Sequence, residues 1–252
     1  MKLKQILNWL GLVVVLAVNG LANTLPLNNQ TTGEISDKIP VLFTPAGYVF
    51  SIWGLIYLAL LAFAAYQSRS GASAEELHER IGYWFFASCV FNSAWIFAWH
   101  YDQVALSLLC MLGLLASLLA VYLRLDIGKR SVSAGEERWV HLPFSIYLGW
   151  ISVATVANVS ALLYTLGWSG GPLAPEAWTA IMVIVAGVLG IAMTLLRNEI
   201  AYPLVIVWAS VGIAVARGFG SSVGMVAIAS AVVVAVVLIA AWLRRRSGAA
   251  GA

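Results

Sequence analysis

The chain has 252 residues, of which 62% are hydrophobic and only 10% are charged. A water-soluble domain of this length carries about a quarter charged residues, so this composition excludes one and is typical of an integral membrane protein. The formal net charge of +3 is too small and too scattered to indicate a nucleic-acid partner. The two cysteines, Cys89 and Cys110, lie inside apolar stretches, which predicts buried thiols and gives no indication of the compartment.

Apolar runs of about 17–25 residues, separated by charges, Pro or Gly, predict eight membrane-spanning segments. Each is expected to be helical, because a segment in lipid must satisfy its backbone hydrogen bonds internally. In chain order the predicted spans are Ile6–Leu25, Thr44–Gln67, Ile81–His100, Val104–Leu123, Val140–Gly167, Trp178–Leu196, Ile200–Ala216 and Phe219–Leu243. The expected fold is therefore an all-α, polytopic helical bundle.

The distribution of positive charges predicts the orientation. If all eight segments span and the N-terminus is cytoplasmic, twelve of the fourteen Lys and Arg residues lie on the inner side, and only Lys38 and Arg217 lie outside. The twelve are Lys2, Lys4, Arg69, Arg80, Arg124, Lys129, Arg130, Arg138, Arg197, Arg244, Arg245 and Arg246. This asymmetry favours two cytoplasmic termini and a location in a bacterial plasma membrane.

Two segments allow alternatives. The first run could instead be a secretory signal, since Lys2 and Lys4 precede it and Gly20-Leu21-Ala22 ends in small residues. The outer connection Pro26–Phe43 is longer than a hairpin needs, and its length fits a lid or a solvated connector equally well. At the other end, residues 244–252 are expected to be a basic, flexible cytoplasmic tail, with Arg244–Arg246 anchoring the last helix at the headgroups.

The sequence contains no catalytic constellation and no metal-ligand spacing. Every Asp and Glu falls in a connection or at a helix end, which argues against a proton-coupled pump. His100 could ligate the metal of a tetrapyrrole, but no second His stands at ligand spacing, which favours a solvated histidine at a helix end. We therefore predict neither catalytic nor metal-binding residues.

Aromatic and amide side chains recur at helical spacing in three predicted spans. Trp53 and Tyr57 are four residues apart and share a helix face. The third span carries a stripe of Ser88, Asn92, Trp95 and Trp99, and the fifth a stripe of Tyr147, Trp150, Ala154 and Asn158. Buried Asn is also common as a link between helices, and Trp as an interfacial anchor. As a set, however, flat rings with a few amide donors suit a large planar apolar ligand.

These stripes resemble the TspO/MBR family of tryptophan-rich sensory proteins. Residues 43–57, FTPAGYVFSIWGLIY, are similar to the start of the family's second helix. Asn92-Ser93-Ala94-Trp95 is similar to its third-helix Asn-x-x-Trp signature, and residues 142–158, LPFSIYLGWISVATVAN, to its fifth-helix pattern. The resemblance covers residues 1–168, although this chain has two residues between Phe50 and Trp53 where the family usually has three.

The resemblance implies a five-helix bundle, often dimeric, that binds porphyrins between its helices beneath a closing loop, here Pro26–Phe43. Carried over by motif position, the ligand-binding residues are Tyr48, Trp53, Tyr57, Asn92, Trp95, Trp150, Ala154 and Asn158. No cofactor is obligatory in this interpretation, and a bound porphyrin or haem would be the ligand. The expected partners are membrane lipids, a planar hydrophobic small molecule and a second copy of the chain, with no nucleic acid.

The last three spans are the largest departure from that five-helix pattern. We expect residues 1–168 to form the TspO-like bundle and residues 169–243 to form a three-helix addition whose small residues pack on the bundle or on a second subunit. The predicted function is a membrane-embedded sensor or binding protein for tetrapyrroles. A transporter of a small lipophilic or uncharged solute is the main alternative, and a porphyrin-degrading enzyme that uses Trp radical chemistry is a weaker one.

Overall fold

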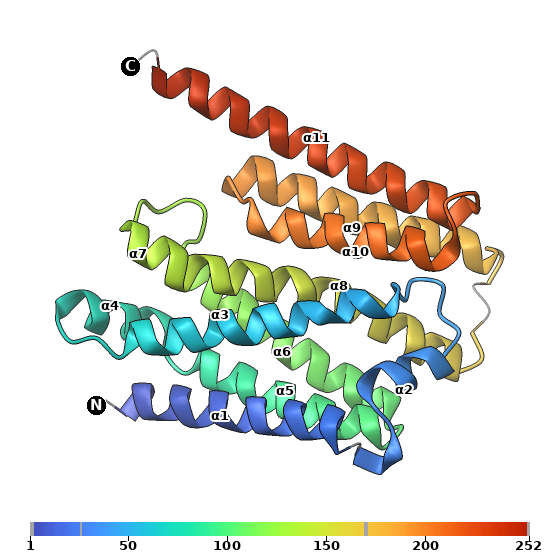
Figure 1. Ribbon diagram of the computed structural model, residues 1–252, viewed down its shortest axis with the longest axis horizontal. Coiled ribbons are helices and arrows are strands. Elements are labelled where there is room, and N and C mark those ends of the chain that lie inside the picture. The colour runs from blue at the N-terminus through green and yellow to red at the C-terminus, as the bar shows by residue number, and fades with distance from the viewer. Residues whose placement is uncertain (1–2, 26, 169–170, 251–252) are drawn as a thin grey trace.

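The apolar runs form helices that lie side by side along one direction (Figure 1). The computed structural model describes residues 3–25, 27–168 and 171–250, and no strand occurs among them. The long helices are α1 (Leu3–Thr24), α3 (Ile52–Gln67), α5 (Trp84–His100), α6 (Val104–Arg124), α8 (Leu142–Thr165), α9 (Pro175–Arg197), α10 (Ala201–Arg217) and α11 (Ser222–Ala250). The all-α, polytopic membrane architecture is thus confirmed.

Six helical segments are long and apolar enough to cross a membrane by length and composition. Two of the eight predicted spans are shorter, since α5 and α10 have 17 residues each and therefore rise about 25 Å, at the lower limit for a span. Helix α5 meets the length only together with α4 (Ala72–Ile81), from which it is bent by 49°. That α5 and α10 each cross the membrane therefore stays a prediction, and so does the total of eight crossings.

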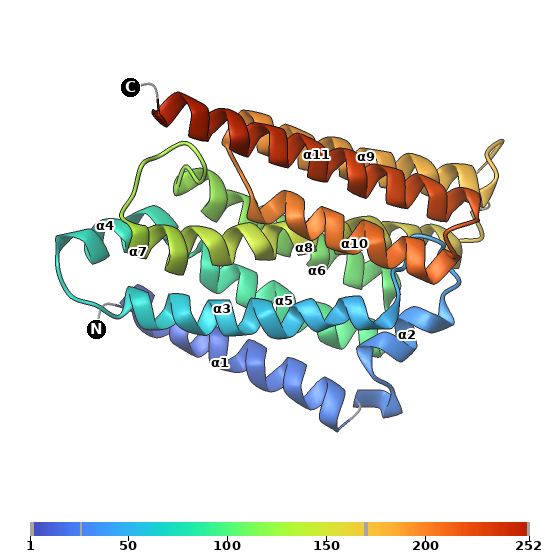
Figure 2. The same ribbon diagram turned by 45° about the horizontal axis from the view of Figure 1, so that its top comes forward.

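The bundle has two parts that pack against each other through α8 and α10. In the first part, α5 contacts α1 and α6, while α8 contacts α6 and α3. In the second, α9, α10 and α11 contact one another, and α11 lies farthest from α1 (Figure 2). The turn between α9 and α10 is tight because Asn198 adopts a left-handed conformation and its N–H bonds to the carbonyl of Met193.

Several connections are more helical than the sequence suggested. The predicted inner loops contain the amphipathic helix α4 and the short helix α7 (Ala134–Glu136), which Ser133 caps. Helix α7 continues through the π-helical turn η3 (Glu137–His141) into α8, because Pro143 has no N–H with which to complete a regular α-helical ladder. Helix α11 continues through the predicted basic tail as far as Ala250; residues 251 and 252 lie outside the described part.

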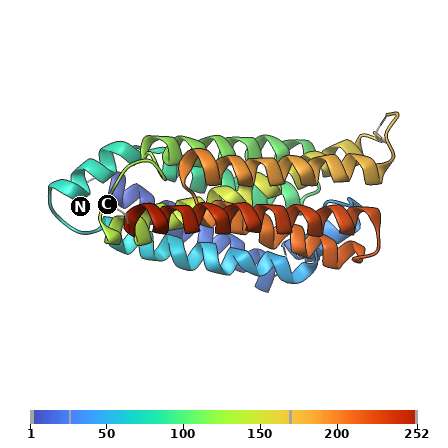
Figure 3. The same cartoon turned by 90° about the horizontal axis from the view of Figure 1, so that it is seen from above.

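The two ends of the bundle differ in charge. Both termini lie at the same end as α4 (Figures 1 and 3), where Lys4 pairs with Glu79, Arg130 with Glu76 and Arg197 with Asp126. Lys38 and Arg217 lie at the opposite end, with α2 (Thr32–Lys38) and the last turn of α10. The Lys and Arg residues are therefore divided between the two ends of the bundle as the sequence predicted. Lys2 lies outside the described residues.

Candidate ligand-binding site

The stripes of α3, α5 and α8 meet at the end of the bundle opposite the termini, beneath α2. They enclose a cavity of about 50 Å³. Five predicted site residues line it: Trp53, Trp95, Trp150, Ala154 and Asn158. Because these residues come from three helices far apart in the chain, the structure brings together what spacing on each helix could only suggest.

A column of four aromatic rings lies along one side of the cavity, and three of them, Trp53, Trp95 and Trp99, line it. The ring of Trp53 stacks on Tyr57 at 5.5 Å between centroids and on Trp95 at 6.1 Å, and Trp95 stacks on Trp99 at 6.1 Å. The interplanar angles are 22°, 27° and 19°, so successive rings are close to parallel. Such offset stacking leaves flat π surface beside the cavity.

Trp150 and Tyr147 of α8 contact this column, and Trp150 also lines the cavity. Both contact the Trp53 ring edge to face, with centroids 6.1 Å and 6.2 Å apart. The indole N–H groups of Trp95 and Trp150 are buried and have no hydrogen-bond partner in the described part of the chain. Buried donors are nearly always bonded in folded proteins, so these two N–H groups are available to an acceptor in the cavity.

A second hollow, of about 180 Å³, lies on the α1 side of the same aromatic rings. It is lined by Asn19 and Asn23 of α1 and by Tyr57, and it shares Trp53 and Trp95 with the first cavity. The aromatic column is therefore a partition between two chambers. Tyr57, predicted as a site residue, belongs to this second chamber.

Asn92 does not face either chamber. Its side-chain N–H donates to the Tyr147 hydroxyl at 2.9 Å, and its carbonyl oxygen accepts from the Asn19 amide at 2.8 Å. Asn92 therefore links α5 to α8 and α1, as buried amides commonly do between membrane helices. Asn158 differs, because it lines the cavity while it bonds to Ser107 of α6 at 3.2 Å.

Tyr48 also lies away from the chambers. It belongs to the short 3-10 helix η2 (Gly47–Ser51), which turns its ring outward to contact Trp208 of α10, edge to face at 5.3 Å. The change of helical phase between η2 and α3 explains this, because residues before Ile52 do not continue the stripe of Trp53 and Tyr57.

The predicted lid, Pro26–Phe43, folds over the cavity. Apart from Pro26, which lies outside the described residues, it contains the turn η1 (Leu27–Asn29) and α2, whose start is fixed by a capping box between Thr31 and Glu34. Those Thr31 contacts, the backbone N–H foremost, lower the pKa of the Glu34 carboxyl. Thr32 and Ser36 of α2 line the cavity, and the Trp99 indole donates to the Thr32 carbonyl at 3.4 Å.

His100 lies beneath the beginning of the lid. It was predicted to be solvated, which is wrong, since the side chain is fully buried and its Nδ1 lies 2.8 Å from the carbonyl of Ile96. Its own carbonyl accepts a hydrogen bond from the Asn28 amide at 2.9 Å. The helix end is covered because η1 packs on it. His78 and His141 are buried as well.

The end of the lid and η2 are held by α10, one of the three additional helices. The Ala46 N–H donates to the Gly212 carbonyl at 3.1 Å, the Trp208 indole to the Val49 carbonyl at 3.2 Å, and Arg217 to the Thr44 carbonyl at 3.3 Å. Gly212 makes this approach possible, because a Cβ there would lie 2.2 Å from a methyl group of Val49.

The sequence reasoning missed several residues of the cavity. Trp99 stands four residues after Trp95 on the stripe, so its spacing could have added it to the predicted site. Phe50 contacts Trp150 edge to face at 5.8 Å and borders both chambers. Thr32, Ser36 and Ile39 come from the lid, and no periodic pattern could have placed them there.

A family model described as TSPO-like protein matches residues 5–243 of the chain. The chain belongs to the TSPO-like family. None of the curated proteins matches it, and none of the solved structures does. Membership indicates an integral membrane protein of the TspO sensor or binding kind, in a family that is generally not enzymatic. The match continues beyond residue 168, so α9, α10 and most of α11 fall within the TSPO-like region.

Proposed function

We propose that this TSPO-like chain binds a planar hydrophobic ligand of the tetrapyrrole class between α3, α5 and α8. The observation that carries the proposal is the column of parallel rings from Tyr57 to Trp99 beside two buried, unpaired indole N–H groups. Aromatic faces favour a flat π system, and the N–H groups of Trp95 and Trp150 favour an acceptor such as a carboxylate or a carbonyl.

The size of the cavity requires the site to open. A volume of about 50 Å³ holds a few water molecules at most, whereas pockets for drug-sized ligands measure about 300–1,000 Å³. The segment that can move to admit a ligand is α2, which is a short helix with its own capping box. Within the described residues, α2 is bonded to α5 through the Trp99 indole and the Thr32 carbonyl, and η1, which precedes α2, through Asn28 and the His100 carbonyl. Ligand binding is therefore expected to displace α2 while α3, α5 and α8 stay in place.

The test replaces two rings of the column. Trp53→Phe/Trp95→Phe removes indole surface and one of the unpaired N–H groups, and the affinity for protoporphyrin, measured by titration calorimetry, is expected to fall about tenfold, since aromatic contacts contribute about 0.5–1.5 kcal/mol each. The control is Trp178→Phe/Trp242→Phe, since Trp178 lies near the start of α9 and Trp242 is exposed on α11. Equal affinities for all three proteins would overturn the proposal.

A further inference from the structure

A further hollow, the basic hollow, lies at the end of the bundle opposite the two aromatic chambers, where both termini are found. It measures about 800 Å³ and lies between the loop that joins α6 to α7, the start of α8, and the turn between α9 and α10. It shares no lining residue with the two aromatic chambers. Its chemistry is therefore independent of the proposed ligand site.

The hollow has an excess of positive charge. Lys129, Arg130, Arg138 and Arg245 line it, against the carboxyl groups of Glu137 and Glu199. Neither Lys129 nor Arg138 forms an ion pair within the described residues. Arg245 donates to the carbonyls of Asn198 and Thr194, which carry no charge to neutralise it.

Of the two carboxyl groups, that of Glu199 is buried and that of Glu137 is exposed. Burial raises the pKa of the Glu199 carboxyl, although a hydrogen bond from the Tyr202 N–H acts in the opposite direction. Burial in a low-dielectric environment disfavours the ionised form. Arg130 is paired with Glu76, whereas Lys129, Arg138 and Arg245 form no ion pair within the described residues.

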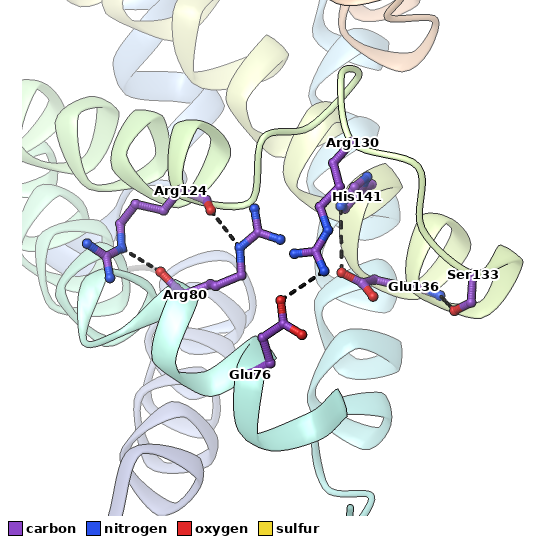
Figure 4. Close-up of polar contacts among 7 residues, drawn as sticks. All are labelled: Glu76, Arg80, Arg124, Arg130, Ser133, Glu136 and His141. Atoms are coloured by element: carbon purple, nitrogen blue, oxygen red, sulfur yellow. Dashed lines mark hydrogen bonds and ion pairs between the residues drawn. The ribbon is translucent and has the colours of Figure 1, made fainter. Parts of the chain in front are cut away.

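A buried polar side chain without a partner also lines the hollow. His141 is 6% exposed, and its Nε2 has no hydrogen-bond partner in the described chain. The nearest carboxylate oxygen, of Glu136, lies 4.0 Å away, beyond hydrogen-bond distance (Figure 4). Arg130 reaches past His141 towards Glu76 in the same view, with a separation of 2.8 Å. The Nε2 atom is thus directed at Glu136, which does not line the hollow, and His141 forms part of the wall.

The walls of the hollow are held in place before any ligand arrives. Arg197 pairs with Asp126 at 3.0 Å and so fastens the α6–α7 loop to the end of α9. Gly128 has a φ of +81°, and a Cβ at this position would lie 1.8 Å from the carbonyl oxygen of Arg197. The loop can approach the turn this closely only with glycine.

We propose that this hollow binds a phosphate group, held by Arg138, Lys129 and Arg245. Guanidinium groups match the geometry of phosphate oxygens. The position beside the first turn of α8 suits either a phospholipid headgroup or a soluble phosphate ester. Both sources present the same chemistry to these side chains.

The test compares ligands on the full-length protein in detergent. Inorganic phosphate, against chloride at equal ionic strength, is expected to raise the thermal unfolding midpoint, and labelled phosphatidylglycerol is expected to bind more tightly than labelled phosphatidylcholine. A response to phosphate alone assigns a soluble ester, a preference for phosphatidylglycerol alone assigns a headgroup, and both together support the shared site. No response to either overturns the proposal.

Matched variants locate the binding. Lys129→Gln/Arg138→Gln is expected to weaken binding at least about tenfold, since each cation near an anionic surface contributes about 1 kcal/mol. The control Arg69→Gln/Arg246→Gln removes two cations from the same end, but outside the hollow, and is expected to bind as wild type. Equal losses in both double variants would show diffuse surface attraction and overturn the proposal.

Discussion

Asn92 shows how one side chain can organise several helices in a membrane protein. Its two hydrogen bonds join α5 to α1 through Asn19 and to α8 through Tyr147, and its side chain is fully buried. The aromatic column lies beside this junction, because Trp95 follows one turn later on α5 and Tyr147 contacts Trp53. The amide therefore positions the rings without facing the cavity.

Replacement of Asn92 is accordingly expected to destabilise the fold. Asn92→Leu leaves the buried Tyr147 hydroxyl without a partner and the Asn19 amide with only its bond to the Val15 carbonyl, at a cost of about 1–2 kcal/mol in the free energy of unfolding. Denaturant titration in mixed micelles measures this loss. The matched control is Asn23→Leu, because Asn23 is exposed on α1 and bonds only to Asn19 of its own helix. A loss no greater than that of the control contradicts the structural role.

Periodicity along each helix placed five of the predicted residues around one cavity, and their role in ligand binding stays a prediction. Trp53, Trp95, Trp150, Ala154 and Asn158 line the cavity as expected, because a helical stripe fixes which side chains share a face. The same stripe cannot tell whether a neighbouring helix occupies that face. Asn92 is thus turned to polar partners on α1 and α8, which only the packing of three helices determines.

At the scale of elements, η2 is the joint between the lid and the transmembrane bundle. It follows the lid directly, leads into α3 and packs against α10 through Val49, which is fully buried. Three hydrogen bonds attach residues 44–49 to α10. The additional helices therefore hold the end of the lid, which assigns α10 a part in the opening of the ligand site.

Enlarging Gly212 is expected to loosen this joint. In Gly212→Leu the new side chain meets a Val49 methyl group at 2.2 Å and Pro45 at 3.1 Å, and overpacking of this kind costs about 1–3 kcal/mol. We expect a lower unfolding midpoint, and several-fold faster association of protoporphyrin in stopped-flow fluorescence quenching. Association is faster because η2, displaced from α10, no longer holds the end of the lid in place.

The control for this prediction is Gly54→Leu on α3. A Cβ at Gly54 has no heavy atom within 4 Å, so the added side chain projects into open space. Its unfolding midpoint and association rate are expected to match those of the wild type. If Gly212→Leu behaves in the same way, η2 does not depend on its contact with α10.

The elements that the sequence did not predict are those that fold only in contact with helices distant in the chain. The hydrophobic runs predicted the long helices because length and apolarity alone specify a membrane span. Helices α2 and α4 are short and polar, and isolated helices of their length are unstable in water. They are held by contacts with α5 and α6, respectively, which no local pattern along these segments records.

At the scale of the whole molecule, the two ends of the bundle differ in charge and in the kind of cavity that they contain. The aromatic chambers lie at the end with α2, and the basic hollow lies at the end with both termini. Positively charged connections favour the cytoplasmic side. The proposed phosphate site is therefore expected to face the cytoplasm, and the proposed ligand site to face outward.

Cysteine labelling tests this orientation and the number of spans together. In a Cys89→Ala/Cys110→Ala background, whose native thiols are buried, single cysteines are introduced by Ser131→Cys in the α6–α7 loop, Asp37→Cys in α2 and Gly220→Cys after α10, all at exposed positions. A membrane-impermeant maleimide is expected to label positions 37 and 220 in intact cells, and position 131 only after the membrane is opened.

The decisive position is 220, because the 17 residues of α10 are short for a span. Protection of position 220 in intact cells, with position 37 labelled, would mean that α10 turns back within the membrane and that the chain crosses it fewer than eight times.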